Sequence, residues 1–144
     1  MRILLIDDSF QFSDVLIKLL TATHDEVVLA LDFYEAEELL KNKQFGAIIL
    51  DMNMPLTKSL LAYKQETYGS LITGLVWYNY FGKKLIPANT KIILCSAYSK
   101  LSIENRIERS NYQFDLFKKF DFINKSDTLL QKKLMNILTI SESR

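Results

Sequence analysis

Short, uninterrupted runs of aliphatic residues constrain the fold of this chain more than any other feature. Four runs rich in Ile, Leu and Val are followed by a weaker fifth: Ile3–Ile6, Val27–Ala30, Ala47–Leu50, Ile92–Cys95 and Phe122–Ile123. Unbroken apolar runs of this length are typical of parallel strands covered on both faces, since neither face is then polar. The sequence therefore predicts a parallel sheet with helices on both sides.

Segments with helical periodicity follow each of these runs. Asp32 and Glu35 have the spacing of a helix N-cap and its N3 partner. The predicted apolar helix faces are Phe12, Val15, Leu16, Leu19 and Leu20; Ala36, Leu39 and Leu40; Leu71, Ile72, Leu75 and Val76; Ile103, Ile107, Phe114 and Phe117; and Leu129, Leu130, Leu134, Ile137 and Leu138. Alternation of strand and helix throughout predicts an α/β fold with a doubly wound parallel sheet.

Length and charge limit the remaining possibilities. The 144 residues suffice for one domain, which we expect over 1–140, with 141–144 as a tail. The 18 basic and 17 acidic residues give a net charge of +1, so we expect neither nucleic acid nor an acidic membrane as partner. The single Cys95 lies in an apolar run, as expected of a buried thiol in a reducing compartment. Without a signal peptide or a membrane-length apolar stretch, we expect a cytoplasmic protein.

Polar residues suited to one reaction lie at or just after the ends of four predicted strands. They are Asp7, Asp8, Asp51, Ser96 and Lys125. Ligands of open parallel sheets bind beyond the carboxyl ends of the strands, so we expect these side chains to converge. The only histidine, His24, is far in sequence from all of them, and we expect it at the surface.

Three converging carboxylates repel one another and favour a bound cation. A small hard ion such as Mg²⁺ (or Mn²⁺) takes carboxylate oxygens and keeps several waters. We expect Asp8, Asp51 and the backbone carbonyl of Asn53 as direct metal ligands, with Asp7 acting through water.

An aspartate carboxylate can also be the nucleophile that attacks phosphorus. Phosphoryl transfer depends mostly on positioning and on neutralising spread negative charge. We expect Asp51 to accept the phosphoryl group, the Lys125 ammonium and the Ser96 hydroxyl to bind its oxygens, and backbone N–H groups at Met52–Asn53 and Ala97 to add donors. No general base is required, because the carboxylate is already charged.

Each of these residues also has a purely structural interpretation. Asp7–Asp8 could cap a helix, Asp51 could form a turn, Ser96 could end a strand and Lys125 could be a solvated charge. The agreement of order, position and residue type across the whole set favours the functional interpretation.

The chain resembles a receiver domain of two-component response regulators. The matching pieces are Asp7–Asp8, the DMNMP segment 51–55, Ser96–Ala97 and Lys125, each after a predicted strand. The resemblance implies a flavodoxin-like sheet of order 2-1-3-4-5. It also implies that Asp51 is phosphorylated by a sensor histidine kinase or a histidine phosphotransfer protein, and that the domain hydrolyses its own acyl phosphate.

The resemblance implies further roles around the site. Ser96 is the switch hydroxyl, and Phe122 takes the place of the switch aromatic that turns inward on phosphorylation. The surface that changes is that of the fourth helix, fifth strand and fifth helix, which a downstream protein target would read. Asn53 and Tyr98 occupy positions that tune phosphoryl lifetime. Homodimerisation is left open.

The chain departs from the family pattern in three places. An insertion at about 56–68 follows Pro55, where the family places a glycine soon after the proline. The 98–120 region is extended, and Ser126 replaces a proline often linked to a cis peptide bond. A group of aromatic residues near the insertion either packs as a satellite core or forms a partner surface: Tyr68, Trp77, Tyr78, Tyr80 and Phe81.

Three functions compete. The first is a phosphorylatable switch that acts only on its own phosphoryl group and is not a conventional turnover enzyme. The second is a receiver-like protein-interaction module that works without phosphorylation. The retained Asp8, Asp51, Ser96 and Lys125 argue against it, while the long insertion leaves it open. The third is a Mg²⁺-dependent phosphohydrolase, which usually has a second acid two residues after the nucleophile, where this chain has Asn53.

Overall fold

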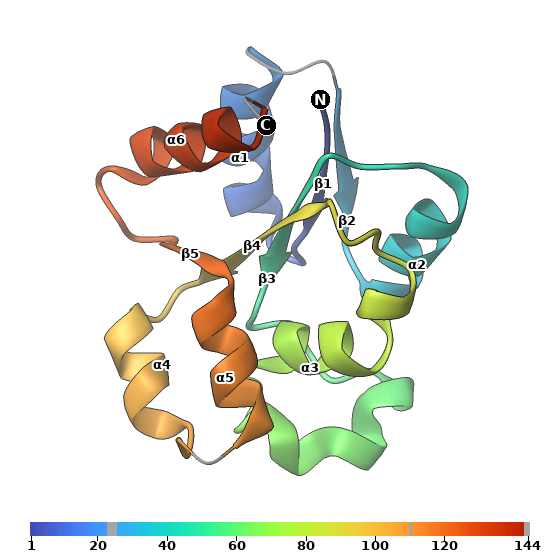
Figure 1. Ribbon diagram of the computed structural model, residues 1–144, viewed down its shortest axis with the longest axis vertical. Coiled ribbons are helices and arrows are strands. Elements are labelled where there is room, and N and C mark those ends of the chain that lie inside the picture. The colour runs from blue at the N-terminus through green and yellow to red at the C-terminus, as the bar shows by residue number, and fades with distance from the viewer. Residues whose placement is uncertain (23–25, 110, 143–144) are drawn as a thin grey trace.

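The computed structural model describes residues 1–22, 26–109 and 111–142 (Figure 1). The elements are β1 (Arg2–Ile6), α1 (Phe10–Thr21), β2 (Glu26–Ala30), α2 (Phe33–Asn42), β3 (Ala47–Asp51), the 3-10 helical segment η1 (Lys58–Thr67), α3 (Thr73–Tyr80), the short 3-10 turn η2 (Gly82–Lys84), β4 (Lys91–Ser96), α4 (Lys100–Arg106), α5 (Tyr112–Lys119), β5 (Asp121–Asn124) and α6 (Leu130–Glu142). His24, expected at the surface, lies outside these ranges.

The five strands form one parallel sheet of order β2-β1-β3-β4-β5. This confirms the predicted fold class, and every predicted apolar run lies within a strand. The side chains of a strand alternate between its two faces, so the aliphatic runs supply two separate cores. Ile3 and Leu5 contribute to one core and Leu4 and Ile6 to the other.

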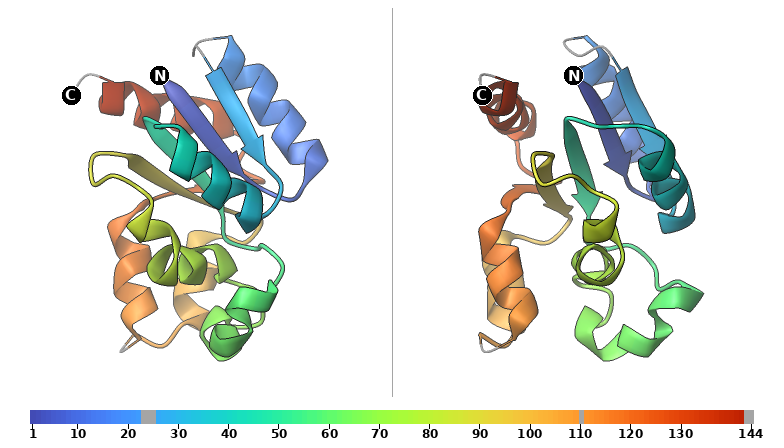
Figure 2. Two further views of the ribbon diagram at one scale, coloured as in Figure 1. Left: turned by 90° about the vertical axis from the view of Figure 1, so that its right-hand side faces the viewer. Right: turned by 45° about the vertical axis from the view of Figure 1, so that its right-hand side comes forward.

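Helices cover both faces of the sheet (Figure 2). On one face, α1 and α6 bury Leu16, Leu20, Leu134 and Leu138 against the sheet. On the other face, α2, α3, α4 and α5 enclose the larger core, which includes Trp77. None of the helices in the described ranges combines the length and apolar character needed to cross a bilayer.

One helix prediction holds in detail and one is wrong. The Asp32 side chain accepts a hydrogen bond from the Glu35 N–H (2.8 Å), as predicted for an N-cap. In α1, however, Val15 is 54% exposed while Ser13 is buried, so Val15 does not belong to the apolar face. Leu16 and Leu20 are sufficient to anchor α1, because they lie one turn apart on the buried side.

The region predicted as one fourth helix forms two helices, α4 and α5. The backbone of Ile107 is extended, with φ −94° and ψ 131°, which ends α4. The Asn111 side chain accepts a hydrogen bond from the Gln113 N–H (2.8 Å) and begins α5. The predicted fifth helix is therefore α6, and it continues to Glu142, so Ser141 and Glu142 of the predicted tail are helical.

The insertion lies below α3, at the lower end of the view in Figure 1. It forms η1, whose backbone kinks at Tyr63. Tyr68 at its end and the following Gly69 and Ser70 all have positive φ (53°, 68° and 67°). The predicted aromatic group packs inward, against the larger core of the domain and not as a separate satellite. Trp77 is buried, and the other members, Tyr68, Tyr78, Tyr80 and Phe81, are partly buried against the same core.

Candidate functional site

The parallel sheet brings the predicted site residues to one edge. Asp7 follows β1, Asp51 ends β3, Ser96 ends β4 and Lys125 follows β5. Pairing of Asp51 with Cys95, and of Ser96 with Asn124, aligns the carboxyl ends of β3, β4 and β5. The convergence expected from the sequence is therefore found.

The three aspartates form one acidic cluster. Carboxylate oxygens of Asp7, Asp8 and Asp51 all lie within 4.8 Å of one another. Asp7 and Asp51 are buried and Asp8 is exposed, so the cluster opens toward solvent through Asp8. The Asp7 Oδ1 accepts a hydrogen bond from the Ser9 N–H (2.8 Å), which fixes that carboxylate at the start of α1.

Lys125 lies between the two buried carboxylates. Its Nζ is 2.8 Å from Asp7 Oδ2 and 3.4 Å from Asp51 Oδ2. The ammonium also lies 4.7 Å from the centroid of the Phe12 ring, which covers it from α1. The backbone N–H of Lys125 donates to the Ser96 carbonyl (2.8 Å), which holds the lysine beside the end of β4.

The charges in the cluster shift the protonation of its members. Burial, followed by the charge of Asp7, raises the pKa of Asp51 to about 7, although Lys125 opposes the shift. Burial alone would lower the pKa of Lys125, but its hydrogen bond to Asp7 and the charge of Asp51 raise it. The ammonium therefore stays charged, while Asp51 lies close to its titration midpoint at neutral pH.

Asn53 lies beside Asp51 and contacts two segments. Its N–H donates to Asp51 Oδ1 (3.0 Å). Its side-chain Oδ1 accepts hydrogen bonds from the Ser96 hydroxyl (2.8 Å) and the Ala97 N–H (3.3 Å). Its Nδ2 donates to the carbonyls of Leu71 (3.1 Å) and Ser70 (3.4 Å). The sequence suggested Asn53 as a metal ligand and a tuning residue, but not these links to the insertion.

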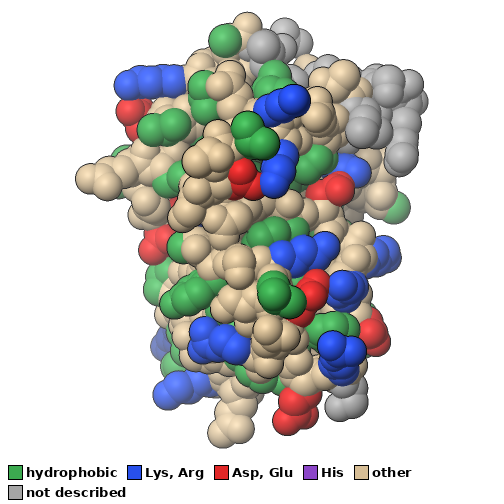
Figure 3. Space-filling view, turned by 90° about the vertical axis from the view of Figure 1, so that its left-hand side faces the viewer, with side chains coloured by type: hydrophobic (Ala, Val, Ile, Leu, Met, Phe, Trp, Pro, Cys, Tyr) green, Lys and Arg blue, Asp and Glu red, His purple; other side chains and the backbone are tan. Residues whose placement is uncertain are grey.

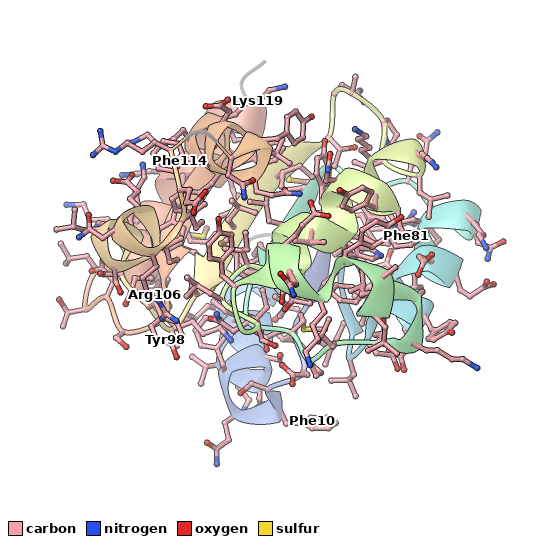
Figure 4. The ribbon with its side chains drawn as sticks, turned by 90° about the horizontal axis from the view of Figure 1, so that it is seen from below. Phe10, Phe81, Tyr98, Arg106, Phe114 and Lys119 are labelled. Carbon is pink, nitrogen blue, oxygen red and sulfur yellow. The ribbon has the colours of Figure 1, made fainter. Side chains whose placement is uncertain are left out.

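The remaining predicted residues border the site. The Tyr98 N–H donates to Ser96 Oγ (3.0 Å), and the 45%-exposed Tyr98 ring lies 5.8 Å from the guanidinium carbon of Arg106 (Figure 4). Phe122 is half-buried and packs edge-to-face on Phe117, with ring centroids 5.6 Å apart. Peptide bonds within the described ranges are trans, Lys125–Ser126 included.

Sequence reasoning missed Gly74, near the start of α3. A Cβ atom at this position would lie 2.2 Å from the Asp51 carbonyl oxygen, and the Gly74 N–H donates to the Met52 carbonyl (3.1 Å). Only glycine allows α3 to approach the loop after β3 this closely. The signal available in the sequence was a glycine inside a predicted helix.

Comparison with solved structures gives receiver domains along nearly the whole chain. The receiver domain of the Francisella response regulator 1452 is 15% identical, with a TM-score of 0.66, and 99% of this chain aligns with 97% of that one. The signal receiver domain of a response regulator from Bacteroides fragilis is 17% identical, with a TM-score of 0.67, over 99% of this chain and 97% of that one.

A third similar structure contains a phosphorylated residue. It is a response regulator protein from Burkholderia pseudomallei with a phosphorylated aspartic acid, a calcium ion and citrate. It is 17% identical, with a TM-score of 0.61, over 99% of this chain and 69% of that one. No protein-family model and no curated protein matches the sequence. The chain thus has the CheY-like receiver fold that its sequence predicted.

Proposed function

We propose that this chain is a phosphoacceptor switch, in which Asp51 accepts a phosphoryl group from phosphohistidine of a sensor histidine kinase or a histidine phosphotransfer protein. One observation carries this proposal: Lys125 Nζ lies 3.4 Å from the Asp51 carboxylate, within a cluster of three aspartates. The similarity to receiver domains supports it.

The donor set fits a divalent cation. With all three aspartates ionised, the cluster holds three carboxylates against the one Lys125 ammonium, an excess of two negative charges. All the side-chain donors are carboxylate oxygens, which Mg²⁺ and Mn²⁺ prefer. Asp8, Asp51 and the Asn53 carbonyl would hold the ion, with Asp7 acting through water. When bound, the ion supplies positive charge to the transferring phosphoryl group.

Transfer would proceed by attack of an Asp51 carboxylate oxygen on phosphorus. A bond forms between that oxygen and phosphorus while the phosphorus–nitrogen bond of phosphohistidine breaks, and the electron pair passes to the imidazole nitrogen. The Lys125 ammonium would bind one phosphoryl oxygen, and the Ser96 hydroxyl and the Ala97 N–H would bind another. These donors stabilise charge spread over the equatorial oxygens, which is the main requirement of such transfers.

The response would reach a protein target through the surface of α4, α5, β5 and α6, with Ser96 and Phe122 as the moving side chains. Among the described residues on this side of the molecule, Lys and Arg side chains are interspersed with Asp and Glu and do not gather in an extended basic patch that would favour nucleic acid (Figure 3). We place the protein in the cytoplasm, a location with which the buried free thiol of Cys95 is compatible. We expect no turnover beyond its own phosphorylation and dephosphorylation.

The test is incubation with acetyl phosphate and Mg²⁺, followed by intact-mass measurement. We expect one phosphoryl group per chain in the wild type and none in Asp51→Ala or in the presence of EDTA. A wild type that stays unlabelled while it binds a partner would support the phosphorylation-independent interaction module instead. Sustained turnover of p-nitrophenyl phosphate would support the phosphohydrolase.

A further inference from the structure

The side chain of Asn53 joins the proposed phosphorylation site to Ser70 and Leu71, directly after the insertion. Its carboxamide oxygen accepts from the Ser96 hydroxyl at 2.8 Å and the Ala97 N–H at 3.3 Å. Its carboxamide nitrogen donates to the carbonyls of Leu71 at 3.1 Å and Ser70 at 3.4 Å. Because a carboxamide is rigid and planar, a rotation that changes one set of contacts also changes the other.

Two of these contacts involve groups that the proposed function needs elsewhere. The Ser96 hydroxyl and the Ala97 N–H are the donors assigned above to a phosphoryl oxygen. In the unphosphorylated chain both of them bind the oxygen of Asn53. The carboxamide oxygen and a phosphoryl oxygen therefore compete for the same donors.

We propose that Asn53 is a positioning residue that holds Ser96 and Ala97 in the unphosphorylated state and that transmits their release to residues 68–71, where the insertion ends and α3 approaches. This inference rests on the proposed function. Once the donors bind the phosphoryl group, the carboxamide oxygen loses both partners and turns toward water. The same rotation withdraws the nitrogen from the Ser70 and Leu71 carbonyls.

The segment that Asn53 holds is strained. Tyr68 and Ser70 have φ values of 53° and 67°, in the left-handed region that non-glycine residues seldom adopt, and Gly69 between them has φ 68°. Such conformations persist only where the surrounding contacts impose them. Two of its local bonds are long: 3.4 Å separates the Leu71 nitrogen from the Tyr68 oxygen and the Ser70 nitrogen from Thr67 Oγ1, while the Ile72 N–H donates to the Thr67 carbonyl at 3.1 Å. Loss of the Asn53 contacts therefore lets the segment relax.

The insertion is also bonded to the region before and at the start of α5. The Tyr68 hydroxyl accepts hydrogen bonds from Asn111 Nδ2 (3.0 Å) and from the Glu108 N–H (3.4 Å). The Glu66 carboxylate accepts from the Tyr80 hydroxyl (2.7 Å) and from Gln113 Nε2 (3.3 Å). Relaxation of residues 68–71 thus reaches Glu108, Asn111 and Gln113, which lie before and at the start of α5 in the proposed output surface.

Fluoroberyllate with Mg²⁺, a phosphoryl mimic, tests the competition. Asn53→Ala removes the competing oxygen and keeps the backbone carbonyl, so we expect about fivefold tighter fluoroberyllate binding by calorimetry, from the release of two hydrogen bonds. Asn89→Ala, at an exposed asparagine before β4, is the matched control and should bind as the wild type does. Unchanged or weaker binding in Asn53→Ala would overturn the inference.

Hydrogen exchange tests the transmission. In the wild type, fluoroberyllate should make the amides of residues 68–74 exchange about fivefold faster, because their segment loses its contacts to Asn53. In Asn53→Ala these amides should already exchange fast and change no further. In the wild type, fluoroberyllate should also speed the exchange of the Glu108 amide. Tyr68→Phe should keep the response at residues 68–74 but lose the one at Glu108, because it lacks the hydroxyl that accepts from the Glu108 N–H and from Asn111 Nδ2.

Fluoroberyllate binding distinguishes a failure of the proposed function from a failure of the role given to Asn53. If neither the wild type nor Asn53→Ala binds fluoroberyllate, the proposed function fails. If the wild type binds it and residues 68–74 become protected or stay unchanged, only the role of Asn53 is wrong.

Discussion

Burial of the Asp51 carboxylate makes the metal-free protein less stable as pH rises. Asp51 is 2% exposed, and burial and the charge of Asp7 raise its pKa from 3.8 to about 7. Between these two pH values the folded chain keeps a proton that the unfolded chain has lost. The free energy of unfolding therefore falls as pH increases through this window. Asp51→Asn removes the titrating group and should abolish this part of the pH dependence.

The size of the effect follows from the shift. One pKa unit corresponds to about 1.4 kcal/mol, so between pH 5 and pH 8 the wild type should lose about 2–3 kcal/mol more stability than Asp51→Asn. The asparagine keeps an oxygen that can accept the Asn53 N–H, now bonded to Asp51 Oδ1 at 3.0 Å. The difference in stability between the wild type and Asp51→Asn therefore reports the effect of the Asp51 charge alone.

Urea unfolding in EDTA at several pH values measures this difference. The single tryptophan, Trp77, is 1% exposed and stacks on Phe33 at 4.9 Å, so its fluorescence reports global unfolding. Asp14→Asn, at an exposed aspartate of α1, is the matched control and should follow the wild type. Parallel pH curves for the wild type and Asp51→Asn would refute the electrostatic account.

Three further predictions concern the same edge of the sheet. Mg²⁺ at pH 8 should raise the melting temperature of the wild type but not that of Asp8→Ala, because a ligand that binds only the folded state stabilises that state. Equal increases in melting temperature for the two proteins would exclude Asp8 as a metal ligand. Lys125→Ala should cost about 3 kcal/mol of unfolding free energy at pH 8, since it leaves two buried carboxylates without their cation. That loss should shrink at pH 5, where Asp51 is protonated, and a pH-independent loss would contradict the pairing. Gly74→Ala should cost about 2 kcal/mol or more, because its Cβ would lie 2.2 Å from the Asp51 carbonyl oxygen. The control is Gly69→Ala, where the added Cβ meets no neighbouring atom but φ is 68°, and it should cost about 1 kcal/mol of unfolding free energy in the same denaturation assay. A larger loss in Gly69→Ala than in Gly74→Ala would refute the close approach of α3 to Asp51.

Much of the fold could be predicted because its signals are local. Aliphatic runs mark all five strands, and the polar residues that follow them mark the edge where the site lies. The break between α4 and α5 was missed, since Ile103, Ile107, Phe114 and Phe117 fit one helical period and no glycine or proline interrupts them. The N-cap at Asn111 was the available sign.

Long-range contacts could not be predicted from residue spacing. The bond between Asn53 and Ser96 joins positions 43 residues apart, and Asn53 also reaches the end of the insertion. The left-handed backbone of Tyr68 and Ser70 is equally hidden, because neither residue type favours it. These features depend on how the insertion packs, and that depends on the whole tertiary structure.

The central claim is that the acceptor is the carboxylate of Asp51. Borohydride reduces an acyl phosphate to an alcohol, which would convert a phosphorylated aspartate into homoserine. After treatment with acetyl phosphate and Mg²⁺, reduction and peptide mass spectrometry should find homoserine at position 51. An unmodified Asp51, together with a borohydride-resistant phosphate on Ser96 or another hydroxyl, would contradict the account.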